Sequence, residues 1–161
     1  MQPLISLADQ SPIPRKIRAS SGRGPIKVRS SPDGIHIFNR CTGANILLDE
    51  IRTPPSSWAP APRQVSIALT NACELSCSYC YAPKRPAALD FDQLTDWLGE
   101  LDRNGCLGIG FGGGEPTLYP HLKELCDHVS RSTALAVTLT THGHNVDESL
   151  AAGLVGRVHF S

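Results

Sequence analysis

The sequence lacks any apolar run that approaches the ~18 residues of a membrane-spanning helix, which argues against a membrane protein. Its first residues, MQPLISLADQSPIPRK, lack the charged start and the apolar core of a secretory signal. Neither sign of charge dominates, because 15 Lys and Arg balance 15 Asp and Glu. These absences predict a cytoplasmic protein without a membrane partner, and in a reducing cytosol clustered cysteines more often hold metal or do chemistry than form disulfides.

The balanced total hides a basic N-terminal part. Residues 1–64 hold nine Lys and Arg against four Asp and Glu, whereas residues 65–161 hold six against eleven. The basic residues concentrate at Arg15, Lys16, Arg18, Arg23, Lys27 and Arg29. Such a segment can contact an acidic peptide or nucleic acid, or it can be a solvated leader. Because no aromatic residues are interleaved with these charges, we favour the solvated leader and predict no nucleic-acid partner.

Proline divides the chain, because nine of its thirteen prolines fall within the first 62 residues. Residues 1–25 are rich in Pro, Ser, Gly and Arg, which predicts a flexible leader. Residues 26–52 contain three short apolar runs separated by turn signals, and this pattern predicts a small three-stranded β-meander. Residues 53–64 are predicted to be a Pro-rich linker.

From residue 65 the pattern alternates between strand and helix. Short β-branched or glycine-rich runs predict four strands, at 65–70, 106–114, 135–143 and 157–161. Apolar stripes predict a helix that Asp90 and Gln93 cap and Gly105 stops, a second with Pro120 in its first turn, and a third at 146–153. The alternation predicts an α/β fold with a parallel sheet. Since the last strand has no helix after it, residues 65–161 are expected to be the N-terminal part of something longer.

Three cysteines, Cys73, Cys77 and Cys80, stand as C-x₃-C-x₂-C on the loop after the first of these strands, where parallel folds bind ligands. A zinc site usually needs a second pair of ligands, and only Cys77 and Cys80 form a pair. A ferredoxin run needs another spacing and a Cys-Pro, and a thioredoxin-like pair leaves Cys73 idle. A [4Fe–4S] cluster with three thiolates and one open iron uses all three, with a structural metal clip as its alternative.

The cysteine segment, with Tyr79 at the aromatic position, resembles the radical S-adenosylmethionine (SAM) superfamily, whose motif is C-x₃-C-x-aromatic-C after the first barrel strand. Gly113-Gly114-Glu115-Pro116 matches the GGEP element that this family carries at the end of its second strand. The resemblance covers residues 65–161. It implies a partial TIM-like (β/α) barrel, of which the chain contains the first four strands.

The resemblance also implies which residues hold the cofactors. The thiolates of Cys73, Cys77 and Cys80 bind the cluster, and its open iron binds SAM. Residues expected to contact SAM are Gly113, Gly114 and Glu115 at the methionyl amine, Tyr79 beside the adenine, and Thr140 and Ser161 after the third and fourth strands. His142 replaces the Asn of the family's Thr-Asn-Gly-like element. No catalytic residue beyond the cluster ligands is implied.

The reaction that the resemblance implies is one-electron cleavage of SAM, with an electron from a flavodoxin or ferredoxin. The products are methionine and a 5′-deoxyadenosyl radical, which abstracts hydrogen from a substrate. Some relatives that modify ribosomally made peptides carry a short β-rich N-terminal segment that grips a leader peptide, so residues 26–52 favour a peptide substrate. The alternative is a non-catalytic iron–sulfur or SAM-binding module, or an inactive truncated relative.

Other chemistry-bearing residues are predicted to be structural. Cys106 and Cys126 lie on predicted apolar faces, and Cys41 lies in a turn. Trp97 is expected in the core. The histidines, His142 and His144 included, show no ligand spacing and receive no role.

Overall fold

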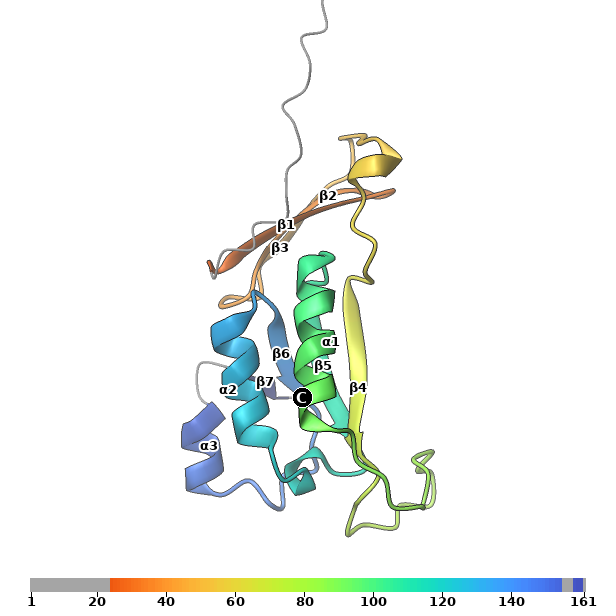
Figure 1. Cartoon of the computed structure of the whole chain (residues 1–161), viewed down its shortest axis with the longest axis vertical. Helices are drawn as coiled ribbons and strands as arrows, with labels where there is room; N and C mark the ends of the chain where they lie inside the picture. Colours follow the sequence, from red (N-terminus) through yellow and green to blue (C-terminus); the bar gives the residue numbers. More distant parts are fainter. Residues whose placement is uncertain (1–23, 155–157, 161) are drawn as a thin grey trace, which may run out of the picture.

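The N-terminal described segment forms an antiparallel sheet, as predicted. A computed structural model describes residues 24–154 and 158–160 (Figure 1). Strands β1 (Ile26–Ser31), β2 (Gly34–Asn39) and β3 (Asn45–Leu48) pair in the order β1-β2-β3. Gly34 begins β2 with φ +126°, and a Cβ there would lie 2.3 Å from the carbonyl oxygen of Leu48, so the position requires glycine.

Residues 49–63 connect this sheet to the second one and pack along β1. The short helix η1 (Pro55–Ser57) lies within this segment. The backbone of Trp58 forms an isolated β-bridge with Ser30 of β1. The backbone N–H of Ala59 donates to the carbonyl of Ser30 at 2.9 Å. The Pro-rich connection is therefore fixed to the first sheet by backbone hydrogen bonds.

The second sheet is parallel and follows the predicted alternation. Its order is β4-β5-β6-β7, with the strands β4 (Gln64–Thr70), β5 (Gly108–Gly113), β6 (Ala136–Leu139) and β7 (His159–Phe160). Three helices cover one of its faces, namely α1 (Phe91–Arg103), α2 (Leu122–Ser132) and α3 (Glu148–Leu154) (Figure 1). The predicted α/β fold with the first four strands of a (β/α) barrel is confirmed.

The helix ends follow from local chemistry. Asp90 caps α1 as predicted, because its side chain accepts the backbone N–H of Gln93 at 2.9 Å. Gly105 ends the helix with φ +88°, a conformation that favours glycine. Helix α2 begins at Leu122 with His121 as its N-cap, so Pro120 precedes the helix and its predicted place in the first turn was wrong. None of the described helices has the length and apolar character to cross a membrane.

The core lies between the parallel sheet and the helices. Strand residues such as Leu69, Ile109, Phe111, Val137 and Leu139 are almost completely buried there. From the helices they meet Leu94, Leu98, Leu125 and Val129, among others. Trp97 lies outside this core with 43% of its surface exposed, so its predicted place was wrong.

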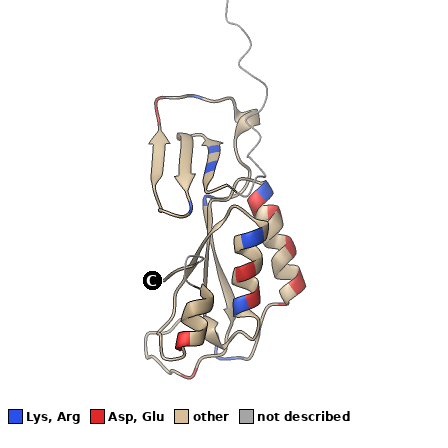
Figure 2. Ribbon diagram, turned by 90° about the vertical axis from the view of Figure 1, so that its left-hand side faces the viewer, with Lys and Arg blue, Asp and Glu red and all other residues tan. Residues whose placement is uncertain are grey.

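The opposite face of the parallel sheet is lined by small and polar side chains. They come from alternate positions of three strands and of the loop after β6, namely Ser66, Ala68, Gly110, Gly112, Thr138 and Thr140. The four strands of the parallel sheet carry no Lys, Arg, Asp or Glu, and the charges around them gather on the helices (Figure 2). Barrel interiors are usually filled with bulky branched residues. Here these positions leave space on the inner face of the sheet.

Buried cations attach the first sheet to the N-terminal ends of the parallel strands. Lys27 of β1 is 1% exposed, and its Nζ lies 2.5 Å from Oδ1 of Asp102 and 2.5 Å from the carbonyl oxygen of Cys106. Arg29 is also buried and donates to the carbonyl oxygens of Gly105 and Ala61. The prediction of a solvated basic segment was therefore wrong for these two residues.

Candidate functional site

The loop after β4, residues 71–87, carries the three motif cysteines and is called the cysteine loop. Its two ends are hydrogen-bonded to each other, since the backbone N–H of Asn71 donates to Ala87 at 2.8 Å and Thr70 bridges to Ala88. Inside the loop, the N–H of Cys80 donates to the carbonyl of Cys77 at 3.1 Å. The loop therefore closes directly above the C-terminal end of β4, as the sequence predicts.

The thiols of this loop face partly toward solvent. Cys73 and Cys77 are half-buried and Cys80 is exposed. Tyr79 is 88% exposed and does not line the hollow beside the loop. Tyr81, two residues further on and 97% exposed, does line it. The motif singled out Tyr79, and nothing in the spacing marks Tyr81.

The segment from Gly113 to Leu118, which is called the glycine turn, packs against the start of the cysteine loop. The N–H of Gly114 donates to the carbonyl of Thr70, and that of Glu115 to the carbonyl of Ala72, both at 2.7 Å. A Cβ on Gly113 would lie 2.3 Å from the oxygen of Thr70, and one on Gly114 would lie 2.3 Å from that of Ala72. These glycines therefore allow the turn to touch the backbone that leads into Cys73.

Glu115 is a buried anion at the centre of the site. Its side chain is 1% exposed, and its Oε1 accepts hydrogen bonds from the N–H and hydroxyl of Thr117 at 3.0 and 2.6 Å. Thr141 Oγ1 donates to the same oxygen at 2.6 Å, and the N–H of His142 donates to Oε2 at 3.1 Å. Burial alone raises the pKa of the Glu115 carboxyl, but the hydrogen bonds together hold the pKa below its ordinary value. The carboxylate is therefore ionised at neutral pH.

Two of the residues that donate to Glu115, Thr141 and His142, come from the loop after β6, residues 140–147, which is called the β6 loop. Thr140 begins this loop and points into the hollow beside the sheet. Thr141 and His142 turn toward Glu115 instead. The sequence singled out Thr140 but assigned no role to His142, although a histidine in place of a short amide was a visible signal. Ser161 lies outside the described residues.

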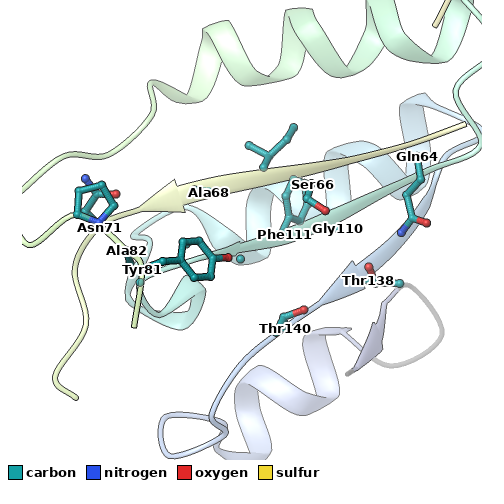
Figure 3. A pocket seen from close by; sticks show the side chains of 15 residues that line it. Gln64, Ser66, Ala68, Asn71, Tyr81, Ala82, Gly110, Phe111, Thr138 and Thr140 are labelled. Atoms are coloured by element: carbon teal, nitrogen blue, oxygen red, sulfur yellow. The ribbon is translucent and has the colours of Figure 1, made fainter. Parts of the chain in front are cut away.

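A hollow of about 470 Å³ lies between the cysteine loop and the inner face of the parallel sheet. Figure 3 shows Tyr81 extending over it, with Ser66, Gly110 and Thr138 along the strands below. Its lining includes Gly113, Gly114 and Thr140 among the residues singled out from the sequence. The volume is typical of sites for small-molecule cofactors and substrates.

The three thiols do not converge on a single point. In the described part of the chain, one group of three side chains offers ligating atoms within 4.8 Å of one another, namely Cys73, Glu74 and His142. Thiolates around a single zinc ion, at ~2.3 Å from the metal, would lie closer together than this limit. The thiols of Cys73, Cys77 and Cys80 are therefore not arranged as the ligands of a single zinc ion.

The buried cysteines are separate from this site. Cys106 and Cys126 are 0% exposed and belong to the core, as predicted. Burial raises the pKa of the Cys106 thiol, whose Sγ–H donates to the carbonyl of Gly108 at 3.3 Å. Cys41 lies exposed in the turn between β2 and β3.

The parallel sheet with a cysteine loop and a glycine turn at its C-terminal edge defines a radical SAM domain, and the chain belongs to the Radical SAM superfamily. The family model matches residues 67–161. The cofactors of this family are a [4Fe–4S] cluster and SAM.

Two curated relatives have names that describe peptide modification. A PqqA peptide cyclase of Streptomyces rochei is 37% identical over 101 residues, which cover 60% of this chain and 28% of that protein. The mycofactocin maturase MftC of Mycobacterium ulcerans is 33% identical over 97 residues, covering 58% of this chain and 26% of the relative. The chain thus spans less than a third of the length of these relatives.

A solved structure shares the fold over a longer stretch. Streptococcus suis SuiB, bound to the precursor peptide SuiA, superposes with a TM-score of 0.66 and 16% identity. The match covers 84% of this chain and 45% of SuiB. Since the family model matches from residue 67 onward, the likeness to SuiB also includes residues of the N-terminal part.

Proposed function

We propose that Cys73, Cys77 and Cys80 bind a [4Fe–4S] cluster and that the adjoining glycine turn binds the methionyl end of SAM. When bound, the cluster supplies the electron that cleaves SAM to methionine and a 5′-deoxyadenosyl radical, which abstracts hydrogen from a substrate. The observation that carries this proposal is the direct contact of two loops. The loop with the three thiols lies against a turn that holds a buried, ionised carboxylate.

The chain's own charges favour a cationic ligand at this place. Within the described residues, no Lys or Arg lies at ion-pairing distance from Glu115, and His142 is its recorded partner at 3.2 Å. A buried carboxylate without a full cationic partner is costly and attracts positive charge. The α-amino group and the sulfonium of SAM carry such charge. The oxygens of Glu115 already accept hydrogen bonds. We therefore infer that its negative charge attracts the α-amino group of SAM electrostatically, without a direct hydrogen bond.

The hollow beside the cysteine loop gives room for the rest of SAM. Gly113, Gly114 and Thr140 lie at its edge, and we propose that they contact the cofactor. We assign the adenine to the neighbourhood of the aromatic residues of the cysteine loop. Tyr81 is favoured over Tyr79 in this role, because Tyr81 lines the hollow.

A peptide is the substrate class that we propose. Strand β3 is the edge of the first sheet, and Ile46, Leu47 and Leu48 on it are 53%, 42% and 37% exposed. An open edge with apolar side chains is suited to pairing with an extended peptide. The names of the peptide cyclase and maturase relatives point to the same class. Residues 26–52 are proposed to act as one unit in this binding, with residues 53–64 linking it to the domain that begins at residue 65.

A protein with this cluster needs a reducing compartment and an electron source. We propose that it works in the cytoplasm with a flavodoxin or ferredoxin as donor, because oxygen and oxidants attack exposed thiolates and open clusters.

The test is anaerobic reconstitution with iron and sulfide. We expect about four irons per chain and a visible spectrum that changes when SAM is added. Cys77→Ala should abolish both, whereas Cys41→Ala, which removes an exposed cysteine outside the cysteine loop, should change neither. Iron that persists in Cys77→Ala would refute the cluster assignment.

Turnover is tested separately, on the full-length protein under reduction with dithionite. Release of 5′-deoxyadenosine supports the proposed enzymatic cleavage of SAM. A spectral change on addition of SAM without that release supports a non-catalytic SAM-binding module instead.

A further inference from the structure

The β6 loop contacts the glycine turn and the cysteine loop at the same time. Toward the glycine turn, Thr141 and the backbone of His142 donate to Glu115. Toward the cysteine loop, Nδ2 of Asn145 donates to Oε1 of Glu74 at 2.5 Å. Because Glu74 directly follows Cys73, this second contact restrains the first thiol of the site.

The imidazole of His142 stands between these two contacts. Its Nδ1 accepts the backbone N–H of His144 at 3.2 Å, so the proton of the neutral ring is on Nε2. Nε2 lies 3.2 Å from Oε2 of Glu115 and 3.4 Å from Oε1 of Glu74. It is shielded from solvent but makes no well-aligned hydrogen bond to either carboxylate. The sulfur of Cys73 lies within 4.8 Å of a ring nitrogen of His142 and of a carboxylate oxygen of Glu74.

A buried N–H without an aligned acceptor costs free energy, so a nearby acceptor is expected. A Cys73 thiolate, as a cluster ligand, would be such an acceptor. We propose that His142 is a positioning residue, which joins the cysteine loop to the glycine turn and donates its Nε2 hydrogen toward the Cys73 thiolate. This inference rests on the proposed function, since it assumes that Cys73 binds the cluster.

The consequence for the cluster is electronic as well as geometric. A hydrogen bond to a cluster thiolate withdraws negative charge from the iron and makes the cluster easier to reduce. Loss of the donor should therefore move the reduction potential to more negative values. A side chain that only fills space would have no such effect.

Three variants separate these roles. His142→Phe keeps a flat ring but removes the N–H, and His142→Gln keeps an N–H donor. His144→Phe changes the exposed neighbouring histidine, whose backbone donates to His142 but whose side chain carries no part of the proposal.

The first measurement is the midpoint potential of the reconstituted cluster, by a redox titration followed by electron paramagnetic resonance. We expect a more negative potential and about tenfold weaker SAM binding in His142→Phe. His142→Gln should restore much of both, and His144→Phe should match the parent. A His142→Phe potential equal to that of the parent, or an equal shift in His144→Phe, would overturn the proposal.

A second measurement needs no cluster. Amide hydrogen exchange of residues 72–81 in the metal-free chain should be faster in His142→Phe than in the parent or in His144→Phe. If the parent forms no cluster, the proposed function fails, and this exchange still decides whether His142 holds the cysteine loop. Unchanged exchange in His142→Phe would refute the positioning role.

Discussion

Gly114 lies at the closest approach between the two loops of the site. The carbonyl oxygens of Asn71 and Ala72 lie where a Cβ on residue 114 would have to be. Gly112 lies two residues earlier, on β5, and a Cβ there would meet nothing within 4 Å. The two glycines therefore differ in what a methyl group would do, although they look alike in the sequence.

Gly114→Ala should destabilise the metal-free chain by about 1–3 kcal/mol, because the new methyl group forces the cysteine loop away from the glycine turn. The same displacement should lower the iron content after reconstitution. Chemical denaturation and iron analysis measure both effects. Gly112→Ala is the matched control and should stay close to the parent, so equal behaviour of the two variants would contradict the close-contact argument.

Glu115 predicts a specific pH dependence. Its pKa in the folded chain lies below the ordinary value of 4.5, so between these two values the unfolded chain binds more protons. Its contribution to stability is present above pH 4.5 and is lost as the pH falls through the lower, folded value.

We expect Glu115→Gln to cost about 1–3 kcal/mol at neutral pH, because charge-assisted hydrogen bonds are lost. The difference from the parent should shrink as the pH falls through that acidic window. Urea denaturation at several pH values measures it, with exposed Glu100→Gln as the control. A difference that stays constant with pH would show that the Glu115 carboxyl is not held ionised.

The candidate site could be predicted from the sequence where backbone spacing defines it. The cysteine spacing and the two glycines follow one another along the chain, so they were visible as a pattern. The roles of His142 and Tyr81 could not be predicted, because they depend on the direction in which loop side chains point. That direction is set by contacts with Glu115 and Glu74, which are distant in sequence.

The first sheet is attached to the parallel one mainly through β1. Lys27 forms a buried ion pair with Asp102 at the end of α1, where a cation also complements the helix dipole. Arg40, after β2, donates to the carbonyl of Thr133 near the start of β6. These contacts hold the two sheets in one arrangement.

Lys27→Met should destabilise the chain by about 3–5 kcal/mol, because it leaves the mostly buried Asp102 without its partner. The double variant with Asp102→Leu should recover part of this loss. Thermal or urea unfolding gives the values, and exposed Lys84→Met serves as the control. A Lys27→Met chain as stable as the control would mean that the ion pair does not hold β1 to α1.

The elements themselves were predictable, but their attachment was not. Periodicity and caps located the strands and helices within a few residues, since these signals are local. The burial of Lys27 and Arg29 was missed because a basic residue in a Pro-rich region is typical of a solvated segment. Their acceptors are carbonyl oxygens near residue 105, which no local pattern reveals.

At the scale of the whole molecule, the six cysteines divide into accessible and inaccessible groups. Cys106 and Cys126 are in the core, whereas the other four reach the surface to differing degrees. This division gives a prediction that needs no substrate.

Alkylation of the folded, cluster-free chain should label four cysteines and spare Cys106 and Cys126, whose burial excludes the reagent. With the cluster bound, Cys41 alone should react. Mass spectrometry of the intact and digested chain counts and locates the labels. Rapid labelling of Cys106 in the folded chain would contradict the described core.

The two sheets place the edge strand β3 and the cysteine loop at opposite ends of the parallel strands (Figure 1). Strand β4, which runs from one end to the other, has seven residues and spans about 23 Å at ~3.3 Å per residue. A peptide that binds β3 and reacts above β4 must cover at least this length. Since an extended peptide advances by about the same distance per residue, the recognised segment and the modified residue should be separated by at least about seven positions in the substrate. The length of strand β4 would thus set a minimum spacing in the sequence of the substrate peptide.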